Sequence, residues 1–387
     1  MNILIISLFL LLYGGINSYI GIRTWQWLQS LVPRALPGWV KWVYWIGFAG
    51  LASAYFLLRF AASFMPASLS TILAQIGSYW WAIFVYAGLL LALVDLLRLI
   101  LRKTKLLAAW KLRSQATLRM TGTVIFTIIL TAIIYGTWRA RTPVVTEYTL
   151  NIAKPAGSYR ELSVVLVSDN HLGLINGNGR IQELVTMVNQ LQPDLILIAG
   201  DLIDDDFKPF LDQAMASELS KLQARLGIYA IMGNHDVRDP ELPSFRAELE
   251  QAGIQLLIDE WVVVDNSLVL AGRDDPSPPR AAGEGMALAD IIANTDRSLP
   301  LLVMDHNPNR LNDTIAVEAD LQVSGHTHAG QIFPFNLVTN MMYEEDWGAL
   351  QRGSTHVVVS SGFGTWGPPM RIGTYPEVVH IQLTFGQ

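Results

Sequence analysis

Five short polar segments in the C-terminal two-thirds of this 387-residue chain contain the side chains that could do chemistry. Together they hold five of the seven histidines. The chain has no cysteine, so carboxylate, imidazole and amide groups are the available metal ligands, a set that suits Mn, Fe or Zn. A carboxylate bridging two cations about 3.5–4 Å apart would complete a two-metal centre of the kind that activates water. The segments are Asp169-Asn170-His171, Gly200-Asp201-Leu202-Ile203-Asp204, Gly233-Asn234-His235-Asp236, His306-Asn307-Pro308 and Gly325-His326-Thr327-His328.

The spacing inside two of these segments bears on which metal each side chain could reach. Side chains two apart on an extended segment point the same way, so Asp169 and His171 are predicted to reach one metal. His326 and His328 have the same spacing, but a bend at a strand end could direct each of them to a different metal. A glycine also precedes three of the candidate ligands, where it lets the backbone turn tightly at a strand tip.

Each polar segment lies where a hydrophobic run ends, so strands of an α/β domain must position these side chains. Ligand sites in open α/β sheets form at the carboxyl ends of the strands. A single His-x-His pair or Gly-Asp turn is weak evidence, but five such segments in this order are not expected by chance. Short β-rich runs joined by helices indicate packed sheets with helices outside. The predicted strands are Val144–Ile152, Leu162–Ser168, Asp194–Ala199, Gly227–Ile231, Trp261–Val264, Leu268–Ala271, Leu301–Met304, Leu321–Val323, Val357–Ser360 and Val378–Leu383; the predicted helices are Gly179–Leu191, Phe210–Leu226 and Glu241–Ala252, and Asp274–Gly285 is the most loop-like stretch.

The order of the five segments resembles the calcineurin-like metallophosphoesterase superfamily, whose signature is D-x-H, G-D-x-x-D, G-N-H-D/E, H and G-H-x-H. All five motifs are intact in this chain. A closer resemblance, to a bacterial membrane-associated branch, rests on His306-Asn307-Pro308 and on the stretches 325–331 and 361–371. The resemblance covers about residues 145–385 and implies a four-layer αββα sandwich. It does not reach the first 140 residues.

The resemblance also implies a role for each residue of the site. A hydroxide activated by two metal ions, with Mn favoured, would attack the phosphorus while the metals bind the phosphoryl oxygens. His235 would stabilise the transition state or protonate the leaving oxygen, and Asp236 would orient His235. Asn170 and Asp204 would lie behind the ligands, although Asp204 could equally be a loop carboxylate. One metal would be held by Asp169, His171, Asp201 and His328, and the other by Asp201, Asn234, His306 and His326, with Asp201 bridging.

Two further stretches could contact the substrate. The glycine-rich tail Ser361–Arg371 could form a wall beside the metals that contains Trp366, and Arg371 could meet a substrate phosphate or headgroup. The alternative is a loop whose arginine pairs with one of the many acidic residues. The segment Ile332–Met342 is unusually apolar for a loop after a metal ligand, so Phe333 and its neighbours could border the site and touch lipid or an acyl chain. Ordinary core packing is the alternative.

The first 141 residues differ in composition from the rest of the chain. They contain thirteen Lys or Arg residues and one acid, whereas the remainder contains fourteen bases and thirty-two acids. The bases lie between long apolar runs, so no nucleic-acid partner is indicated. Four runs, at about 3–20, 42–62, 79–101 and 120–138, approach or exceed the roughly 20 residues that cross a bilayer. We therefore predict an all-α bundle of four transmembrane helices in residues 1–140, a linker and first strand in 141–160, and a catalytic domain in 161–387.

Basic residues predict the orientation of the four spans. The loop at 102–119 contains six bases and no acid, which is a strong cytoplasmic signal. The loop containing Arg23, Arg34 and Lys41 is weakly basic and falls on the same side, and the uncharged loop at 63–78 falls on the other. The N-terminus and the catalytic domain are then outside the bacterial cytoplasmic membrane. Two arginines just after the fourth run weigh against this orientation.

The third run contains the one acidic residue of the membrane part, Asp95, three positions before Arg98. Such a pair could mark a transport path. We favour a pair near the cytoplasmic helix end, with Arg98 extending toward the headgroups, because Arg59 is the only other candidate partner in a span.

These observations predict a membrane-anchored, metal-dependent phosphoesterase that hydrolyses phosphate mono- or diesters. Its substrates would be lipid-linked or belong to the cell envelope, and membrane lipids would be its other contacts. One alternative is a pyrophosphatase acting on a nucleotide-linked lipid, which would need its site on the cytoplasmic side. Another is a non-catalytic membrane sensor or scaffold that retains a metal-binding fold. Loss of a ligand or of the transition-state histidine would favour the sensor, and neither is seen.

Overall fold

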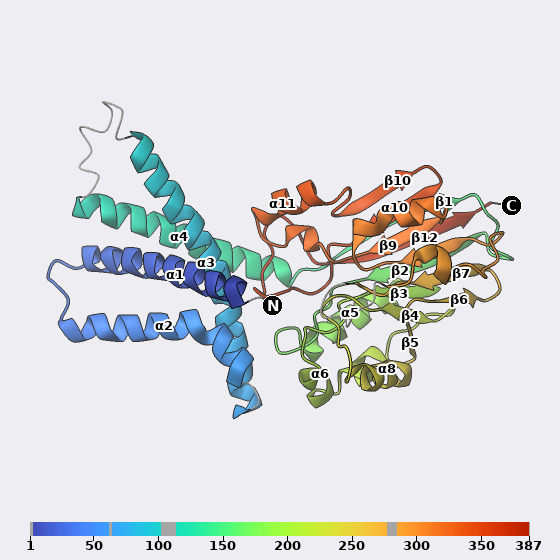
Figure 1. Ribbon diagram of the computed structural model, residues 1–387, viewed down its shortest axis with the longest axis horizontal. Coiled ribbons are helices and arrows are strands. Elements are labelled where there is room, and N and C mark those ends of the chain that lie inside the picture. The colour runs from blue at the N-terminus through green and yellow to red at the C-terminus, as the bar shows by residue number, and fades with distance from the viewer. Residues whose placement is uncertain (1–2, 62–63, 102–113, 277–284, 387) are drawn as a thin grey trace. The chain divides into compact units, whose positions relative to one another are not determined.

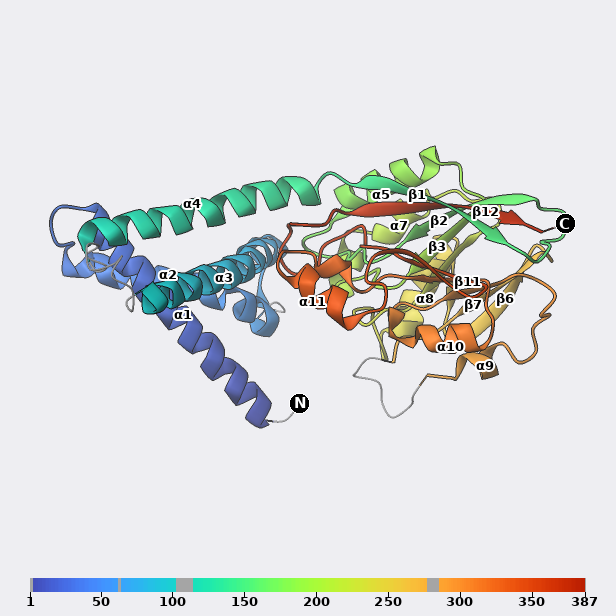
Figure 2. The ribbon, with the colours of Figure 1, turned by 90° about the horizontal axis from the view of Figure 1, so that it is seen from above.

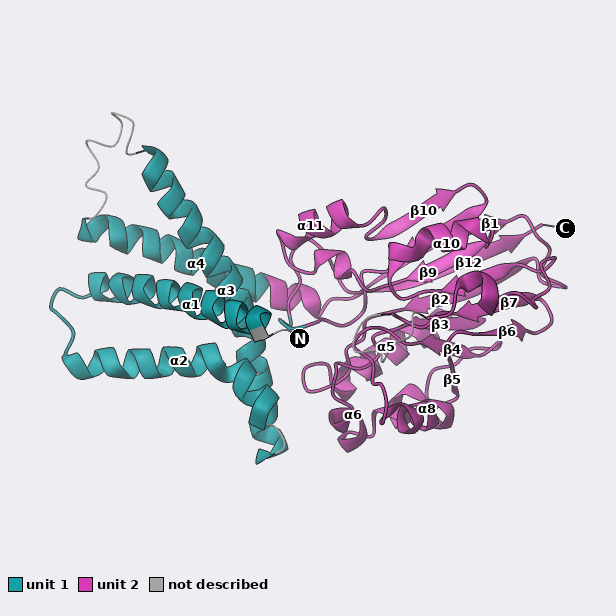
Figure 3. Ribbon diagram, in the orientation of Figure 1, with its two compact units in different colours: residues 1–135, 367–369 teal, residues 136–366, 370–387 magenta. Residues whose placement is uncertain are grey.

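A computed structural model describes residues 3–61, 64–101, 114–276 and 285–386. The chain forms two compact units, coloured separately in Figure 3. Unit 1 comprises residues 1–135 and 367–369, and unit 2 comprises residues 136–366 and 370–387. Most of the basic loop at 102–119 and most of the predicted loop at 274–285 lie outside the described residues.

Four long helices make up the N-terminal part: α1 (Ile3–Leu31), α2 (Gly38–Ala61), α3 (Ala67–Leu101) and α4 (Gln115–Ala140). All four are long and apolar enough to cross a bilayer, so the structure has candidate membrane spans at the four predicted places. The helices are longer than the apolar runs. Residues 67–78, predicted as part of an uncharged loop, form the first turns of α3, and Arg23 lies inside α1.

A polar cluster between α1 and α3 shows that the predicted pairing of Asp95 was incomplete. Arg23 of α1 forms an ion pair with the Asp95 carboxylate. The Tyr19 hydroxyl donates to the same carboxylate at 2.8 Å, and Arg98 donates to it at 3.2 Å. Asp95 therefore has two cationic partners rather than one. The prediction missed Arg23 because the apolar run ends near residue 20, whereas the helix continues to Leu31.

Unit 2 is built on two six-stranded sheets (Figure 1). Strands β2 to β5 run parallel in the first sheet, and β7, β8, β9 and β11 run parallel in the second. The first sheet has the order β1 (Val144–Ile152), β12 (Glu377–Phe385), β2 (Glu161–Val167), β3 (Leu195–Ala199), β4 (Ile228–Ile231), β5 (Ile254–Leu257). The second has the order β10 (Gly348–Arg352), β11 (Thr355–Val359), β9 (Leu321–Ser324), β8 (Leu301–Met304), β7 (Leu268–Gly272), β6 (Glu260–Val264).

Three apolar layers hold unit 2 together and confirm the predicted four-layer αββα sandwich. The central layer lies between the two sheets, where alternate residues of both meet, for example Leu166 and Leu302. A second layer packs the first sheet against α5, α6, α7 and α8, and smaller clusters pack the second sheet against α9 and α10. Figure 2 shows α5 and α7 on one side of the sheets and α9 and α10 on the other. These helices are α5 (Asn178–Gln190), α6 (Lys208–Asp212), α7 (Met215–Leu219), α8 (Leu242–Gln251), α9 (Leu288–Ile291) and α10 (Leu311–Ala316), followed later by α11 (Phe335–Met342), with short 3-10 turns η3 (Pro308–Arg310) and η4 (His328–Gly330).

Three local predictions were wrong. The single helix predicted at 210–226 is broken at Ala214, whose φ of 49° is left-handed, so two short helices replace it. Strands β5 and β10 were not predicted, since β10 is a polar edge strand without an apolar run. The apolar segment 332–342, which follows His328 and was predicted as a loop, contains helix α11.

Candidate metal centre

The candidate ligands follow five strands, three from the first sheet and two from the second. Asp169, Asp201 and Asn234 come two or three residues after β2, β3 and β4, while His306 and His326 follow β8 and β9. The carboxyl ends of both sheets therefore meet at one place, as expected for an α/β site. His328 is supplied by the same turn as His326.

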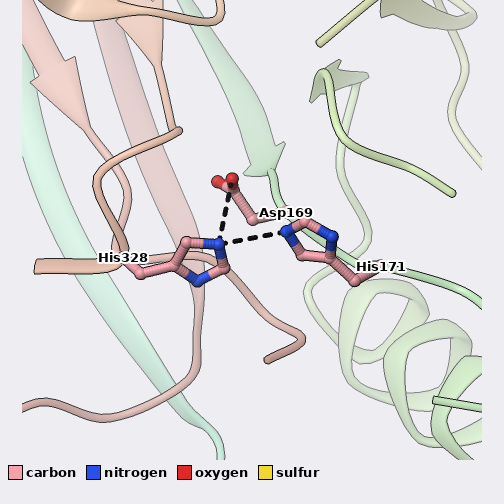
Figure 4. Close-up of side chains that lie close together, drawn as sticks. All are labelled: Asp169, His171 and His328. Atoms are coloured by element: carbon pink, nitrogen blue, oxygen red, sulfur yellow. Dashed lines mark hydrogen bonds and ion pairs between the residues drawn. The ribbon is translucent and has the colours of Figure 1, made fainter. Parts of the chain in front are cut away.

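The first cluster joins Asp169, His171 and His328, all of them buried (Figure 4). The Nε2 atoms of His171 and His328 face each other at 3.0 Å, and His328 Nε2 lies 3.5 Å from an Asp169 oxygen. On the far side of His171, Nδ1 lies 3.4 Å from Asp204, so the other ring nitrogen is directed into the cluster.

The second cluster joins Asp201, Asn234, His306 and His326. His306 Nε2 lies 3.1 Å from Asp201 Oδ2 and 3.2 Å from Asn234 Oδ1, and His326 Nδ1 lies 2.7 Å from the same amide oxygen. His306 Nδ1 lies 2.7 Å from the Ala199 carbonyl, which fixes that nitrogen as a donor and leaves Nε2 as the ligand atom.

Asp201 belongs to the second cluster and also faces the first. Its Oδ2 atom lies 3.1 Å from His306 in the second cluster and 3.8 Å from His171 in the first. Its Oδ1 atom accepts the backbone N–H of His235 at 2.8 Å, which fixes the orientation of the carboxylate. The two histidines of the His-x-His segment are divided between the clusters, as the bend predicted at the strand end allows.

Five of the seven candidate ligands have left-handed backbone conformations: Asp169, His171, Asp201, His326 and His328, with φ between 45° and 73°. Asp169 and His171 reach the same cluster in this left-handed conformation. The extended geometry predicted for these two residues was therefore wrong. Backbone strain of this kind concentrates at functional sites. The preceding glycines act differently: Gly200 has a φ of 84°, whereas a Cβ at Gly325 would collide with Ser168.

The donor set and its charges fit two divalent cations. Burial raises the pKa of Asp201, but the imidazoles of His306, His171 and His235 lower it by more than burial raises it. The net shift is therefore downward, and the carboxylate is ionised. Burial, reinforced by His171 and Arg371, lowers the pKa of His328 well below its ordinary value, so its ring is neutral. Burial lowers the pKa of His306 and of His171, but the carboxylates that face them raise it by more, so both shifts are upward and metal binding would release protons from this site. The first cluster could hold one ion and the second another.

His235 lies beside the two clusters and is positioned by Asp205. Its Nδ1 atom is 2.9 Å from the Asp205 carboxylate, and its ring centroid is 5.1 Å from that of His171 and 5.5 Å from that of Trp366. Burial lowers the pKa of His235, but the hydrogen bond to Asp205 and the charges of Asp201, Asp205 and Asp204 raise it to about 9. A protonated, partly exposed imidazole at this place can donate a proton to a bound group.

Asp236 does not orient the His235 ring, which corrects the role predicted for it. Its buried carboxylate accepts the backbone N–H groups of Ile203 at 2.9 Å and Gly233 at 2.8 Å. It therefore ties the loop after β3 to the loop after β4. Burial, followed by the charge of Asp201, raises the pKa of Asp236 to about 6. Sequence reasoning missed Asp205 because it is the middle one of three consecutive aspartates.

Asn170 is buried, and neither atom of its side-chain amide has a hydrogen-bond partner among the described residues. Its backbone carbonyl is instead covered by Gly364 of the tail, where no Cβ would fit. The structure thus brings Asn170 to the rear of the site through its backbone. Asp204 keeps the place behind His171 that the resemblance implied.

Arg371 cannot contact a substrate, because its side chain is 0% exposed. Its guanidinium donates to the carbonyls of Ser361 at 2.7 Å, Gly362 at 2.9 Å and Gly364 at 2.8 Å. These bonds shape the tail that runs behind Asp169, and burial lowers the pKa of Arg371 to about 9. The arginine is structural: it is buried among backbone carbonyls rather than paired with the acids considered from the sequence, and it also lies 3.5 Å from Nδ1 of the candidate ligand His328.

Trp366 is 52% exposed and its ring lies beside that of His235, while the wall and the substrate contact stay predictions. Gln331 fixes it by a reciprocal pair of hydrogen bonds, each 2.8 Å long, to the backbone N–H and carbonyl of Trp366. Phe333, two residues after Gln331, is also exposed. Gln331 was not singled out from the sequence, because a glutamine after a His-x-His segment has no distinctive signal.

Arg371→Met is expected to lower the stability of the protein by about 2–4 kcal/mol, since three buried carbonyls would lose their charged donor. Thermal unfolding of the full-length protein in detergent should show an apparent melting temperature several degrees below wild type. The matched control is Arg352→Met, whose exposed side chain pairs with Glu344, and a change of about 0.5 kcal/mol or less is expected there. A raised KM with unchanged melting temperature for Arg371→Met would instead indicate substrate contact.

A two-sheet α/β domain with two carboxylate–imidazole clusters at its strand ends defines a metal-binding domain. The calcineurin-like phosphoesterase family matches residues 162–330. A "Transmembrane protein with metallophosphoesterase domain" from Danio rerio is 32% identical over 274 residues, covering 67% of this chain and 62% of that protein. An "Uncharacterized metallophosphoesterase" from Aquifex aeolicus (strain VF5) is 31% identical over 243 residues, covering 62% of this chain and 91% of that protein. The chain therefore belongs to the calcineurin-like metallophosphoesterases.

The relatives and the solved structures overlap this chain to different extents. The chain spans 62% and 58% of the length of the relatives from Danio rerio and Bos taurus, both described as transmembrane proteins. Among solved structures, a protein of Thermus thermophilus, TT1561, is 12% identical with a TM-score of 0.36, covering 52% of this chain and 91% of that one. The family assignment rests on the sequence matches.

Proposed function

We propose that this protein is a membrane-anchored phosphoester hydrolase that uses two metal ions. The observation that best supports this proposal is the position of Asp201, whose Oδ2 atom lies 3.1 Å from His306 and 3.8 Å from His171. When bound, two divalent ions, with Mn favoured, would lower the pKa of a water molecule and neutralise charge on the phosphoryl oxygens. The first ion would be held by Asp169, His171, Asp201 and His328, and the second by Asp201, Asn234, His306 and His326.

The remaining chemistry belongs to His235. Its ring is 19% exposed and stands beside the first cluster, so it can reach the leaving oxygen of a phosphoester bound there. Asp205 holds Nδ1, which leaves Nε2 to donate the proton. Trp366 covers one side of this imidazole and could contact the group being released, with Phe333 further out. The presence of every ligand and of His235 supports an enzyme over a sensor or scaffold.

The test of this proposal is hydrolysis by the purified full-length protein, stripped of metal with a chelator and resupplied with Mn. The panel should contain phosphomonoesters, phosphodiesters and phospholipids. Turnover that disappears on stripping and returns with Mn is expected. Background hydrolysis of every substrate, equal for wild type and for Asp201→Asn, would refute the proposal.

The proposal places unit 2 outside the cytoplasmic membrane of a bacterium. Four spans put both ends of the chain on one side, and the five bases among residues 102–113 favour a cytoplasmic position for that loop. Alkaline phosphatase fused after Gln387 is therefore expected to be active in cells, while a fluorescent protein that matures only in the cytoplasm should stay dark there. The opposite pattern would support the alternative, a pyrophosphatase of nucleotide-linked lipids with its site in the cytoplasm.

A further inference from the structure

An exposed apolar surface lies next to the metal centre in unit 2. We name it the α11 patch and define it as Phe333, Phe335, Leu337, Val338, Met341 and Met342. All six side chains are exposed, Met341 at 87% and Met342 at 64%, and no residue of α11 is buried. Eleven large hydrophobic side chains are exposed among the described residues after 141, and these six come from ten consecutive positions. Such a concentration marks an interaction surface rather than scattered surface hydrophobics.

The α11 patch is fixed to the ligand loop. A Cβ at Gly330, two residues after His328, would collide with the backbone of Phe335 and Asn336, so α11 starts directly against that turn. At the other end, Asp346 accepts a hydrogen bond from Thr339 of α11 at 2.6 Å, and its backbone carbonyl accepts one from Thr327, between the two histidines. The patch is therefore held at a set position relative to the metal ligands.

The patch is also fixed to the end of a membrane helix, through contacts that all lie within unit 2. Ile372 accepts the backbone N–H of Phe333 at 2.8 Å and donates its own to Gln331 at 2.9 Å. The neighbouring Arg371 N–H donates to the carbonyl of Gly136 in the last turns of α4 at 2.9 Å. Figure 2 shows α11 at the end of unit 2 where β1 begins.

The last turns of α4 have the residues of a membrane–water boundary. Trp138 is exposed, and Arg139 and Arg141 follow the apolar part of the helix. Phe333, where the patch begins, is therefore connected through Ile372 and Arg371 to the residues at which a membrane-spanning α4 would leave the bilayer. This position selects lipid, rather than another protein, as the occupant.

The lack of charged side chains in α11 fits an apolar partner for the patch. Residues 329–342 contain no charged side chain, and Glu344, Glu345 and Asp346 follow them. Attraction to anionic headgroups or to nucleic acid therefore does not explain the patch. Burial of apolar area in the acyl boundary does, as for other amphipathic helices that lie in the interface plane.

We propose that the α11 patch docks into the lipid interface and that the substrate is a phosphoester whose acyl chains stay in the bilayer. This inference rests on the proposed hydrolase function and adds the substrate class. The headgroup phosphate would reach the metals past Trp366 while the chains remain beside α11.

The absence of cysteine from these 387 residues allows a direct test of insertion, because Met341→Cys provides a single labelling site in this chain. The protein is labelled with an environment-sensitive fluorophore and reconstituted in phosphatidylcholine nanodiscs that contain nitroxide lipids. A blue-shifted emission that the nitroxide quenches is expected at position 341, and a water-like, unquenched emission is expected at Leu211→Cys, an exposed site on α6. Water-like emission at 341 overturns the inference, and so does blue-shifted emission without quenching, which indicates a protein cover.

Activity then tests the substrate class. Leu337→Ser/Met341→Ser/Met342→Ser is expected to lower turnover of phosphatidic acid and phosphatidylglycerol in nanodiscs by about tenfold or more. Hydrolysis of soluble p-nitrophenyl phosphate and bis-p-nitrophenyl phosphate should change less than about twofold, since these variants touch no ligand. The matched control is Leu211→Ser/Val263→Ser/Met286→Ser, which should leave both unchanged. Equal losses on lipid and soluble substrates, or no loss on lipid, overturn the inference; a wild type inactive on all four substrates, despite a lipid-quenched label, refutes the hydrolase function instead.

Discussion

Asp201→Asn is expected to reduce kcat for every phosphoester by about 10³-fold or more, because the carboxylate that we propose as the bridge between the two metal ions would lose its charge. The substitution keeps the shape of the side chain, and the amide oxygen can still accept the His235 N–H that Asp201 accepts at 2.8 Å. Folding should therefore be retained. The loss of activity should be accompanied by a loss of bound metal, from two ions per chain to one or none.

Metal content measured by plasma mass spectrometry, together with kcat, checks this expectation. The control is Asp206→Asn, the same chemical change in the same loop at a carboxylate that accepts only the backbone N–H of Lys208 among the described contacts. It should retain two ions and near wild-type turnover. An Asp201→Asn protein that keeps both ions and most of its activity would show that Asp201 does not bridge.

The metal ligands could be predicted from the sequence because their chemistry is carried by residue types. Carboxylate, imidazole and amide groups at the ends of buried apolar runs have few structural reasons to be there, and all seven candidate ligands lie together in the structure. The residues around them were harder to assign. Asp205, Asp236 and Arg371 have the types that active sites use, but the type does not show whether a partner is a side chain or a backbone amide.

Elements of the fold could likewise be predicted where the signal is local in the sequence, and not where it depends on distant partners. Strands with continuous apolar runs, such as β3 and β8, were predicted to within one or two residues, since burial on both faces leaves a plain signal. The polar edge strand β10 depends on pairing with β11, which is not a local property. Helix α11 leaves its apolar side chains exposed, so a segment whose partner is outside the chain was interpreted as a loop or as core.

His235→Ala is expected to lower kcat by about 10²–10⁴-fold while both metal ions stay bound, because His235 faces the site without belonging to either cluster. The metal content separates this variant from Asp201→Asn. Its position beside the first cluster and its raised pKa, about 9, assign it to proton donation rather than to metal binding. A metal content that falls with kcat would place His235 among the ligands.

Proton donation makes a sharper prediction about the leaving group. A p-nitrophenolate leaves without a proton, whereas an alkoxide needs one, so His235→Ala should lose far more activity on an alkyl phosphoester than on the p-nitrophenyl analogue. Asp205→Asn should show the same dependence with a smaller loss, of about tenfold, since it removes the charge that holds Nδ1 at 2.9 Å but leaves the ring in place. Asp206→Asn again serves as the control. Equal losses on both leaving groups would mean that the imidazolium acts on the phosphoryl charge through its field, and Asp205 would then matter only for the charge of His235.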